Sequence, residues 1–347
     1  MSYRVADTLS AVRGHVPEVL IPAVAWPALD ALAAVSPDGV SQFGFEVRLA
    51  EDAAAVDLGL AIEPEDEAAK TLAGRTPGAL DTAGAEAWRR LRNFAVAWTE
   101  PGSLLSRWVP FLFLELDAVS AGRSVPEPSV FVALDSPLGA PHGGGGSRAR
   151  GADVTLAVSQ EAARHLLGAP LAGALCEQVV ACFDAVPEGS HVLHLGAMLG
   201  RGAAGVRLSL SIARDELPAY LARIGWDHPV GDLDRCLERY GQVPDRVQLD
   251  FDVAEAIQPR LGVGLQPSRP EGWPILLDRL VGDGLCTPER GEALLAWPGA
   301  ETRRLPGYGF PCRIRRATSH AKISLEPGRP LEAKAYFSAS ARPAFFA

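Results

Sequence analysis

The sequence has very little lysine, no long hydrophobic run and no paired cysteines. Of its 33 basic residues only three are lysines, Lys70, Lys322 and Lys334. No apolar run is long enough to cross a bilayer, and residues 1–17 carry charges instead of the apolar core of a signal peptide. These absences predict a cytoplasmic protein without a membrane partner.

Cysteine spacing and net charge exclude two further classes. The five cysteines are odd in number and widely spaced, and none forms a C-x-x-C pair, so a zinc site is not expected. They fit reduced thiols in the cytoplasm. The net charge of −9 argues against a nucleic-acid partner, which would need a basic surface. Any positively charged pocket must therefore be local.

Two of the three lysines lie in the last predicted hairpin, residues 320–338. Pro327-Gly328 suits a type II turn, because proline fixes its own φ and glycine accepts the positive φ that follows. Side chains of a strand alternate between two faces, so one face is apolar. The other carries His320, Lys322, Ser324, Glu332, Lys334, Tyr336 and Ser338. That polar face is either solvated or part of a binding site.

Four earlier strand pairs show the same alternation: 41–49 with 56–62, 108–119 with 129–135, 191–199 with 206–212, and 246–253 with 260–266. Helices are expected at 18–34, 80–100, 157–185, 215–240 and 271–297, and loops at 64–78 and 299–311.

Two glycine-rich stretches suggest nucleotide binding, but the residues around them do not match the nucleotide-binding motifs. Gly200, Gly202 and Gly205 form a G-x-G-x-x-G string, but an alternating strand follows it where the dinucleotide fingerprint needs a helix. Residues 139–151 lack the ending of a phosphate-binding loop, which leaves a linker or a flap. No organic cofactor is expected.

The order helix, strand, strand, helix repeats five times and predicts an α+β fold in one domain, residues 1–347. If the apolar faces meet the helices, the polar faces turn inward. About ten antiparallel strands would then form a closed β-barrel surrounded by helices, with an interior too wide for side chains to fill. Two open sheets are the alternative.

Five αββα units with a polar interior resemble the ABBA-fold aromatic prenyltransferases, and in plan most closely the bacterial peptide enzymes of the cyanobactin type. The matching motifs are G-F-E at 44–46, K-x-S at 322–324 and A-K-A-Y at 333–336. The resemblance implies transfer of a dimethylallyl or longer prenyl group from its diphosphate to an aromatic or heteroatom acceptor, in a peptide or a small aromatic compound.

The resemblance also implies roles for residues. Glu46 would take the proton of the acceptor, with its pKa raised by partial burial; alternatively it pairs with Arg48 on a solvated face. Cations and a phenol would bind the prenyl diphosphate. The candidates are Arg48, Arg207, Arg313, His320, Lys322, Lys334 and Tyr336. Aromatic walls for the allylic cation would come from Tyr336, Trp108, Trp226 and Trp273.

Asp250 and Asp252 share a strand face and are candidate ligands for a magnesium ion that carries the diphosphate. A salt bridge to a nearby arginine is the alternative. Two further functions stay open. The barrel could bind a precursor peptide or apolar ligand without catalysis, or it could modify peptides by another reaction.

Overall fold

The computed structural model describes most of the chain. The described residues are 4–40, 42–50, 55–74, 85–117, 126–134, 152–201, 205–228, 231–240, 243–244, 246–306 and 308–344. The glycine-rich stretch 139–151 and Gly202 lie outside them.

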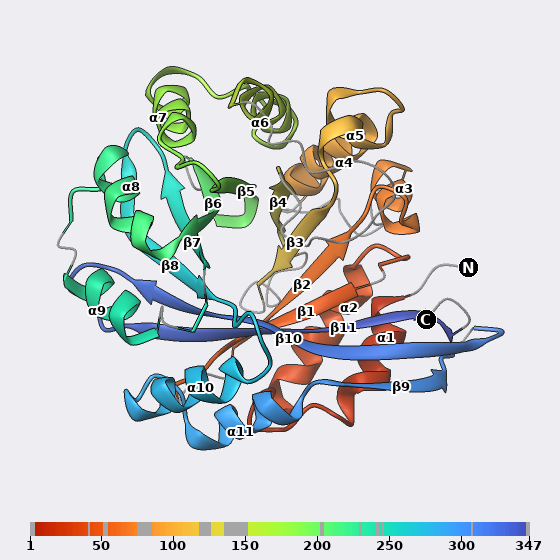
Figure 1. Ribbon diagram of the computed structural model, residues 1–347. Coiled ribbons are helices and arrows are strands. Elements are labelled where there is room, and N and C mark those ends of the chain that lie inside the picture. The colour runs from red at the N-terminus through yellow and green to blue at the C-terminus, as the bar shows by residue number, and fades with distance from the viewer. Residues whose placement is uncertain are drawn as a thin grey trace.

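Ten antiparallel strands close into a barrel (Figure 1). The ring closes because β11 pairs with both β1 and β10, and β10 pairs with β8. An additional strand, β9, pairs with β10 outside the ring. The strands are β1 (Gln42–Arg48), β2 (Val56–Ile62), β3 (Leu112–Leu116), β4 (Ser129–Ala133), β5 (His191–Met198), β6 (Val206–Ala213), β7 (Arg246–Val253), β8 (Ile257–Leu265), β9 (Gly299–Arg304), β10 (Pro311–Leu325) and β11 (Glu332–Pro343). The predicted barrel is confirmed, and the open-sheet alternative is wrong.

Helices surround the barrel on the outside, between successive hairpins (Figure 1). They are α1 (Val5–Arg13), η1 (Ala23–Ala25), α2 (Trp26–Val35), α3 (Glu67–Gly74), α4 (Ala85–Thr99), α5 (Leu104–Trp108), α6 (Ala152–Leu166), α7 (Gly173–Asp184), η3 (Leu199–Arg201), η4 (Arg214–Glu216), α8 (Leu217–Arg223), α9 (Gly231–Tyr240), α10 (Gly272–Gly282) and α11 (Pro288–Ala296).

The hydrophobic core lies between the outer face of the barrel and the helices. Outward-facing Phe45, Leu58, Ile323 and Phe337 are at most 1% exposed. Trp297, just after α11, packs its ring on Phe337 at a centroid distance of 5.1 Å. Period-2 apolar residues therefore hold the helical coat, and the opposite faces line the interior.

Two predicted loops are wrong in part. Glu67–Gly74 forms α3, in which the small apolar residues Ala68 and Ala69 are fully buried. Gly299–Arg304 forms β9, although its residues alternate weakly, because the first half of β10 supplies a pairing partner. Both segments owe their structure to tertiary contacts and not to their own pattern.

The predicted turn of the last hairpin is confirmed. Gly328 has a φ of 76°, and the Arg329 N–H donates to the Glu326 carbonyl at 3.0 Å, which closes the turn between β10 and β11. Gly205 leads into strand β6 and not into a helix. A Cβ at Gly205 would lie 2.1 Å from the Val253 carbonyl oxygen, so this position requires glycine for a close backbone approach.

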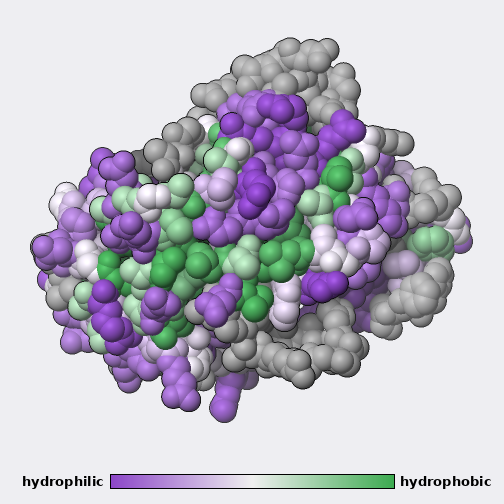
Figure 2. Space-filling model, turned by 90° about the horizontal axis from the view of Figure 1, so that it is seen from above, coloured by the Kyte–Doolittle hydropathy of each residue, from purple (hydrophilic) through white to green (hydrophobic). Residues whose placement is uncertain are grey.

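The outer surface is mixed in polarity. Seen from above, hydrophobic residues form a band across the middle of the face, with hydrophilic residues beside it (Figure 2). Among the described helices, none combines the length and the hydropathy needed to span a bilayer.

Candidate active site

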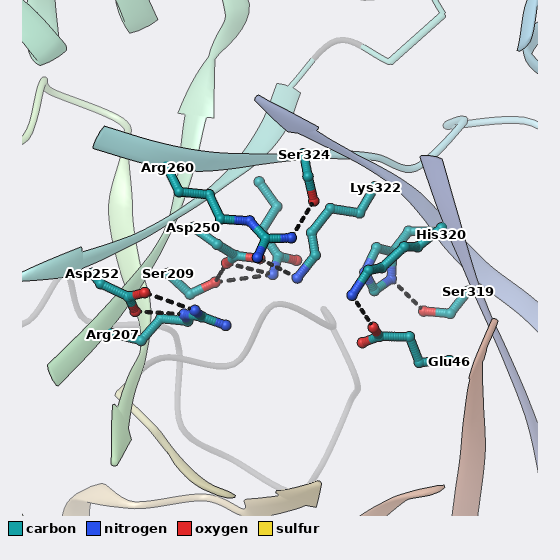
Figure 3. Close-up of polar contacts among 12 residues, drawn as sticks. Glu46, Arg207, Ser209, Asp250, Asp252, Arg260, Ser319, His320, Lys322 and Ser324 are labelled. Atoms are coloured by element: carbon teal, nitrogen blue, oxygen red, sulfur yellow. Dashed lines mark hydrogen bonds and ion pairs between the residues drawn. The ribbon is translucent and has the colours of Figure 1, made fainter. Parts of the chain in front are cut away.

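Polar side chains from β1, β6, β7, β8, β10 and β11 meet inside the barrel (Figure 3). The register places Lys322 of β10 directly opposite Lys334 of β11, and Tyr336 opposite both His320 and Glu46. On the other side of the interior, Arg207 of β6 lies opposite Asp252 of β7. The predicted site residues therefore share one interior, except Arg313.

Each interior lysine is paired with a carboxylate from a different strand. Lys322 Nζ lies 2.7 Å from Asp250 Oδ2, and Lys334 Nζ donates to Glu46 Oε1. Both lysine side chains are mostly buried, at 16% and 14% exposure. Burial alone would lower the pKa of Lys322, but Asp250 and Glu46 raise it above its ordinary value. The interior therefore holds two adjacent ammonium groups.

Glu46 has a strongly perturbed pKa, in the direction opposite to the one predicted. Burial acts to raise the pKa, but the charges of Lys334 and Lys322 and hydrogen bonds from Lys334 and Tyr336 lower it from 4.5 to about 2. The predicted elevation is wrong because the lysine partners outweigh burial. The alternative pairing with Arg48 is also wrong, because Arg48 Nε donates to Glu332 at 2.8 Å.

Asp250 and Asp252 are held by separate partners. Arg207 makes two contacts of 2.8 Å to Asp252. Asp250 binds Lys322 and also accepts hydrogen bonds from Ser209 and Gln248. Within the described ranges no group of three or more histidine, cysteine or acidic residues could hold a metal. Asp252 matches the alternative of a salt bridge to an arginine, whereas Asp250 is paired with a lysine instead. With both carboxylates bound to cations of this chain, these aspartates do not fit a magnesium site.

A second cationic group lies toward the turn of the last hairpin. Arg260 of β8 lies 3.4 Å from both Ser324 and Glu332, and Glu332 also holds Arg48. A pocket of about 250 Å³ opens here, lined by Arg260, Ser324, Glu326, Arg329, Pro330 and Glu332. Arg260 was not identified from the sequence. It shares a strand face with Gly262 and Gly264, and because glycine has no side chain, this face leaves room for longer neighbouring side chains.

His320 and Tyr336 form a flat aromatic surface beside the lysines. Their rings stack at 4.2 Å with an angle of 8°, and Lys322 Nζ lies 5.1 Å from the centre of the Tyr336 ring. Burial, together with the charge of nearby Lys322, lowers the pKa of His320 to about 4, so the imidazole is neutral at pH 7. The Tyr336 hydroxyl donates to Glu46.

A second aromatic group comes from β5 and the second hairpin. His194 packs edge-on against Phe111 and Phe113, at centroid distances of 5.9 and 5.4 Å. Its Nε2 is buried without a hydrogen-bond partner. Burial lowers the pKa of His194 to about 4. No pattern in the sequence identified these aromatic residues, because leucine and valine alternate with the phenylalanines and no polar face stands out.

The predicted tryptophan walls lie elsewhere. Trp108 belongs to α5 and Trp273 to α10, both in the helical coat. Trp226 follows α8 and donates to the Pro259 carbonyl at 3.3 Å. The interior aromatic surfaces are therefore phenylalanine, histidine and tyrosine.

Comparison with known proteins supports the fold. No family model matches this chain, and a search of curated proteins finds no significant match.

Among solved structures, the prenyltransferase PriB in a ternary complex with L-tryptophan and dimethylallyl thiolodiphosphate aligns with a TM-score of 0.53 and 15% identity, over 98% of both chains. Its binary complex with product diphosphate gives 0.50 and 15%, over 96% of both chains. A 6-dimethylallyl tryptophan synthase gives 0.50 and 14%, over 96% of this chain and 94% of that one. A particular closeness to the cyanobactin type stays a prediction. The chain therefore has the ABBA barrel fold found in aromatic prenyltransferases.

Proposed function

We propose that this protein is a prenyltransferase that moves a dimethylallyl or longer prenyl group from its diphosphate to an electron-rich aromatic ring or heteroatom. One observation carries the proposal: Lys322 and Lys334 lie directly opposite each other inside the barrel. Like charges placed opposite on neighbouring strands are destabilising. Such a pair is useful where an anion with several oxygens binds between them.

The diphosphate would accept hydrogen bonds from Lys322 and Lys334, with Arg207, Arg48 and His320 around it. These groups stabilise the negative charge that develops as the allylic C–O bond breaks and its electron pair goes to the diphosphate oxygen. Arg207 suits paired phosphate oxygens, because it already presents two N–H groups to a carboxylate.

The allylic cation left behind needs a pocket with little water and aromatic faces. The stacked His320 and Tyr336 rings provide one such surface, and Lys322 already lies against the Tyr336 ring. Ring faces attract cations more strongly when both are desolvated. The group of Phe111, Phe113 and His194 offers a second surface, which suits a flat aromatic acceptor.

Glu46 would receive the proton that the acceptor loses when the new bond forms. In the unliganded site its pKa of about 2 makes it a poor base. A diphosphate that attracts Lys334 would weaken the Lys334–Glu46 pair, and the pKa of Glu46 would then rise because burial is its largest perturbing influence. Donor binding would thereby activate the base.

The acceptor is proposed to be an indole-like ring, free or within a peptide natural product. PriB was solved with L-tryptophan, and a second structure of the same fold is a tryptophan synthase of the dimethylallyl type. The alternative is a non-catalytic barrel that binds a precursor peptide or apolar ligand. In its favour, interior cations such as Lys322, Lys334 and Arg207 already have carboxylate partners.

Calorimetric titration with dimethylallyl and geranyl thiodiphosphate, with and without Mg²⁺, tests the proposal. We expect binding by the native protein, loss in Lys322→Met, and no change in Lys70→Met, because Lys70 is exposed at 63% on α3. Equal binding by Lys322→Met would refute the assigned site. No binding by the native protein under any condition would favour the non-catalytic alternative.

A further inference from the structure

Part of the sheet projects beyond the closed barrel and carries a group of arginines. It consists of β9, the first half of β10 and the end of β11 (Figure 1). Four exposed arginines lie on one face of it, and we call them the arginine ledge. They are Arg304, Arg313, Arg315 and Arg342.

The strand register places all four on one face. Arg313 lies between Thr302 of β9 and Arg342 of β11, and Arg315 follows two residues later. Arg304 lies two residues after Thr302. Residues two apart on a strand are separated by about 7 Å, and neighbouring strands by about 5 Å. Four guanidinium groups therefore share a small area, which is unfavourable without an anion.

The chain supplies no counterion to these groups among its described residues. None of the four makes a described ion pair or side-chain hydrogen bond, although the protein carries a net charge of −9. Arg342 acts only from a distance on Asp66, whose carboxylate accepts a hydrogen bond from the Glu63 N–H.

Two charged side chains on the opposite face of β9 have partners within the chain. Arg303 donates to the Ala11 carbonyl at 2.9 Å, and Glu301 lies 3.1 Å from His15 Nε2 just after α1. The described β9 charges on that face are therefore already paired, whereas those of the arginine ledge are not.

The arginine face is continuous with the interior of the barrel. Along β11 the residues at every second position from Arg342 back to Lys334 point to the same side. The register with β1 continues through this segment without a shift, from Ser340 to Lys334. Between the arginine and the lysine lie the small polar residues Ser340 and Ser338 and then Tyr336. This row spans about 26 Å, from the ledge to the predicted diphosphate site.

We propose that the arginine ledge binds an acidic, extended peptide segment and directs the adjoining residues of that peptide toward the barrel interior. Charge complementarity identifies the acidic partner. The edge of β9 identifies a peptide, because β9 pairs only with β10 in the described sheet and an extended peptide can add a strand to such an edge. The proposal stands whether or not the protein transfers prenyl groups.

The probe is a fluorescein-labelled peptide of about twelve residues in which glutamate alternates with threonine, matching the two-residue period of a strand. Fluorescence anisotropy measures its binding to the full-length protein. The test variant is Arg313→Glu with Arg315→Glu. The matched control reverses two exposed arginines elsewhere that also lack a described ion pair, Arg107→Glu with Arg269→Glu.

We expect the ledge variant to weaken binding by about tenfold or more, since two attractions become repulsions. The control variant should bind like the native protein, and added salt should weaken binding in both. Backbone N-methylation of the probe at alternate residues should also weaken binding, because it removes the N–H groups that pair with β9. A single Arg304→Glu variant repeats the test if the double variant does not fold.

Three results would overturn the proposal. The first is no binding of the acidic probe by the native protein, and the second is equal loss in the ledge and control variants. The third is tighter binding of an oligothymidylate of the same charge, which would show a general anion surface. Since the assay contains no prenyl donor, its outcome is independent of the test of prenyl transfer.

Discussion

Replacing Lys334 by methionine should destabilise the protein by about 3 kcal/mol at pH 7. The estimate comes from the Glu46 pKa, which falls from 4.5 to about 2 in the folded protein mainly because Lys334 outweighs burial. One pKa unit corresponds to about 1.4 kcal/mol. Removing one partner from a buried ion pair costs a similar amount, about 3–5 kcal/mol.

The pH dependence provides a second, independent signature. A depressed carboxylate pKa stabilises the fold above the unfolded value and loses that effect as the pH falls through the folded value. Glu46 therefore stabilises the native protein fully above pH 4.5, and this contribution disappears between pH 4.5 and about 2. The difference between the native protein and Lys334→Met should shrink over the same range.

Urea unfolding followed by tryptophan fluorescence, repeated across this pH range, measures both effects. Lys70→Met is the matched control, because Lys70 is an exposed lysine whose described ion pair is to Glu67 on its own helix. The double variant Lys334→Met with Glu46→Gln should recover much of the lost stability, since it leaves no unpaired buried carboxylate.

Equal losses of unfolding free energy in Lys334→Met and Lys70→Met would refute this prediction. Failure of Glu46→Gln to rescue Lys334→Met would also refute it, because the lost free energy would then not reside in the unpaired, buried Glu46 charge.

Two further predictions concern the barrel wall. Gly205→Ala should lower the free energy of unfolding by about 2 kcal/mol or more, because its Cβ would lie 2.1 Å from the Val253 carbonyl oxygen. Gly14→Ala is the control and should cost little, because no atom lies within 4 Å of its Cβ. Similar melting temperatures of the two variants would contradict the close approach at Gly205. Burial lowers the pKa of His194 and His320 to about 4, so their NMR signals should not titrate between about pH 5.5 and 8. In the unfolded chain the histidine pKa is 6.5, so both histidines should reduce stability as the pH falls from 6.5 through 4. A normal titration of their NMR signals near pH 6.5 would show that the interior is open to water.

The sequence by itself determined the local elements. Strict alternation in β1, β6 and β11 identified strands and their polar faces, and Pro327-Gly328 located the last turn. It also identified the polar residues of the last hairpin, because lysine is so rare elsewhere. These features depend on neighbours within a few residues, which the linear pattern contains.

Only the tertiary structure decided which of these polar groups meet. The alternation placed Glu46 and Arg48 on one face, and that proximity suggested a pair between them. Closure of the barrel instead brings β11 beside β1. Lys334, which is 288 residues from Glu46 in the sequence, therefore pairs with Glu46, and Arg48 pairs with Glu332. The same closure reverses the direction of the Glu46 pKa shift. Ion pairing and pKa depend on distances across strands, and those distances are set by sheet order, which no local pattern specifies.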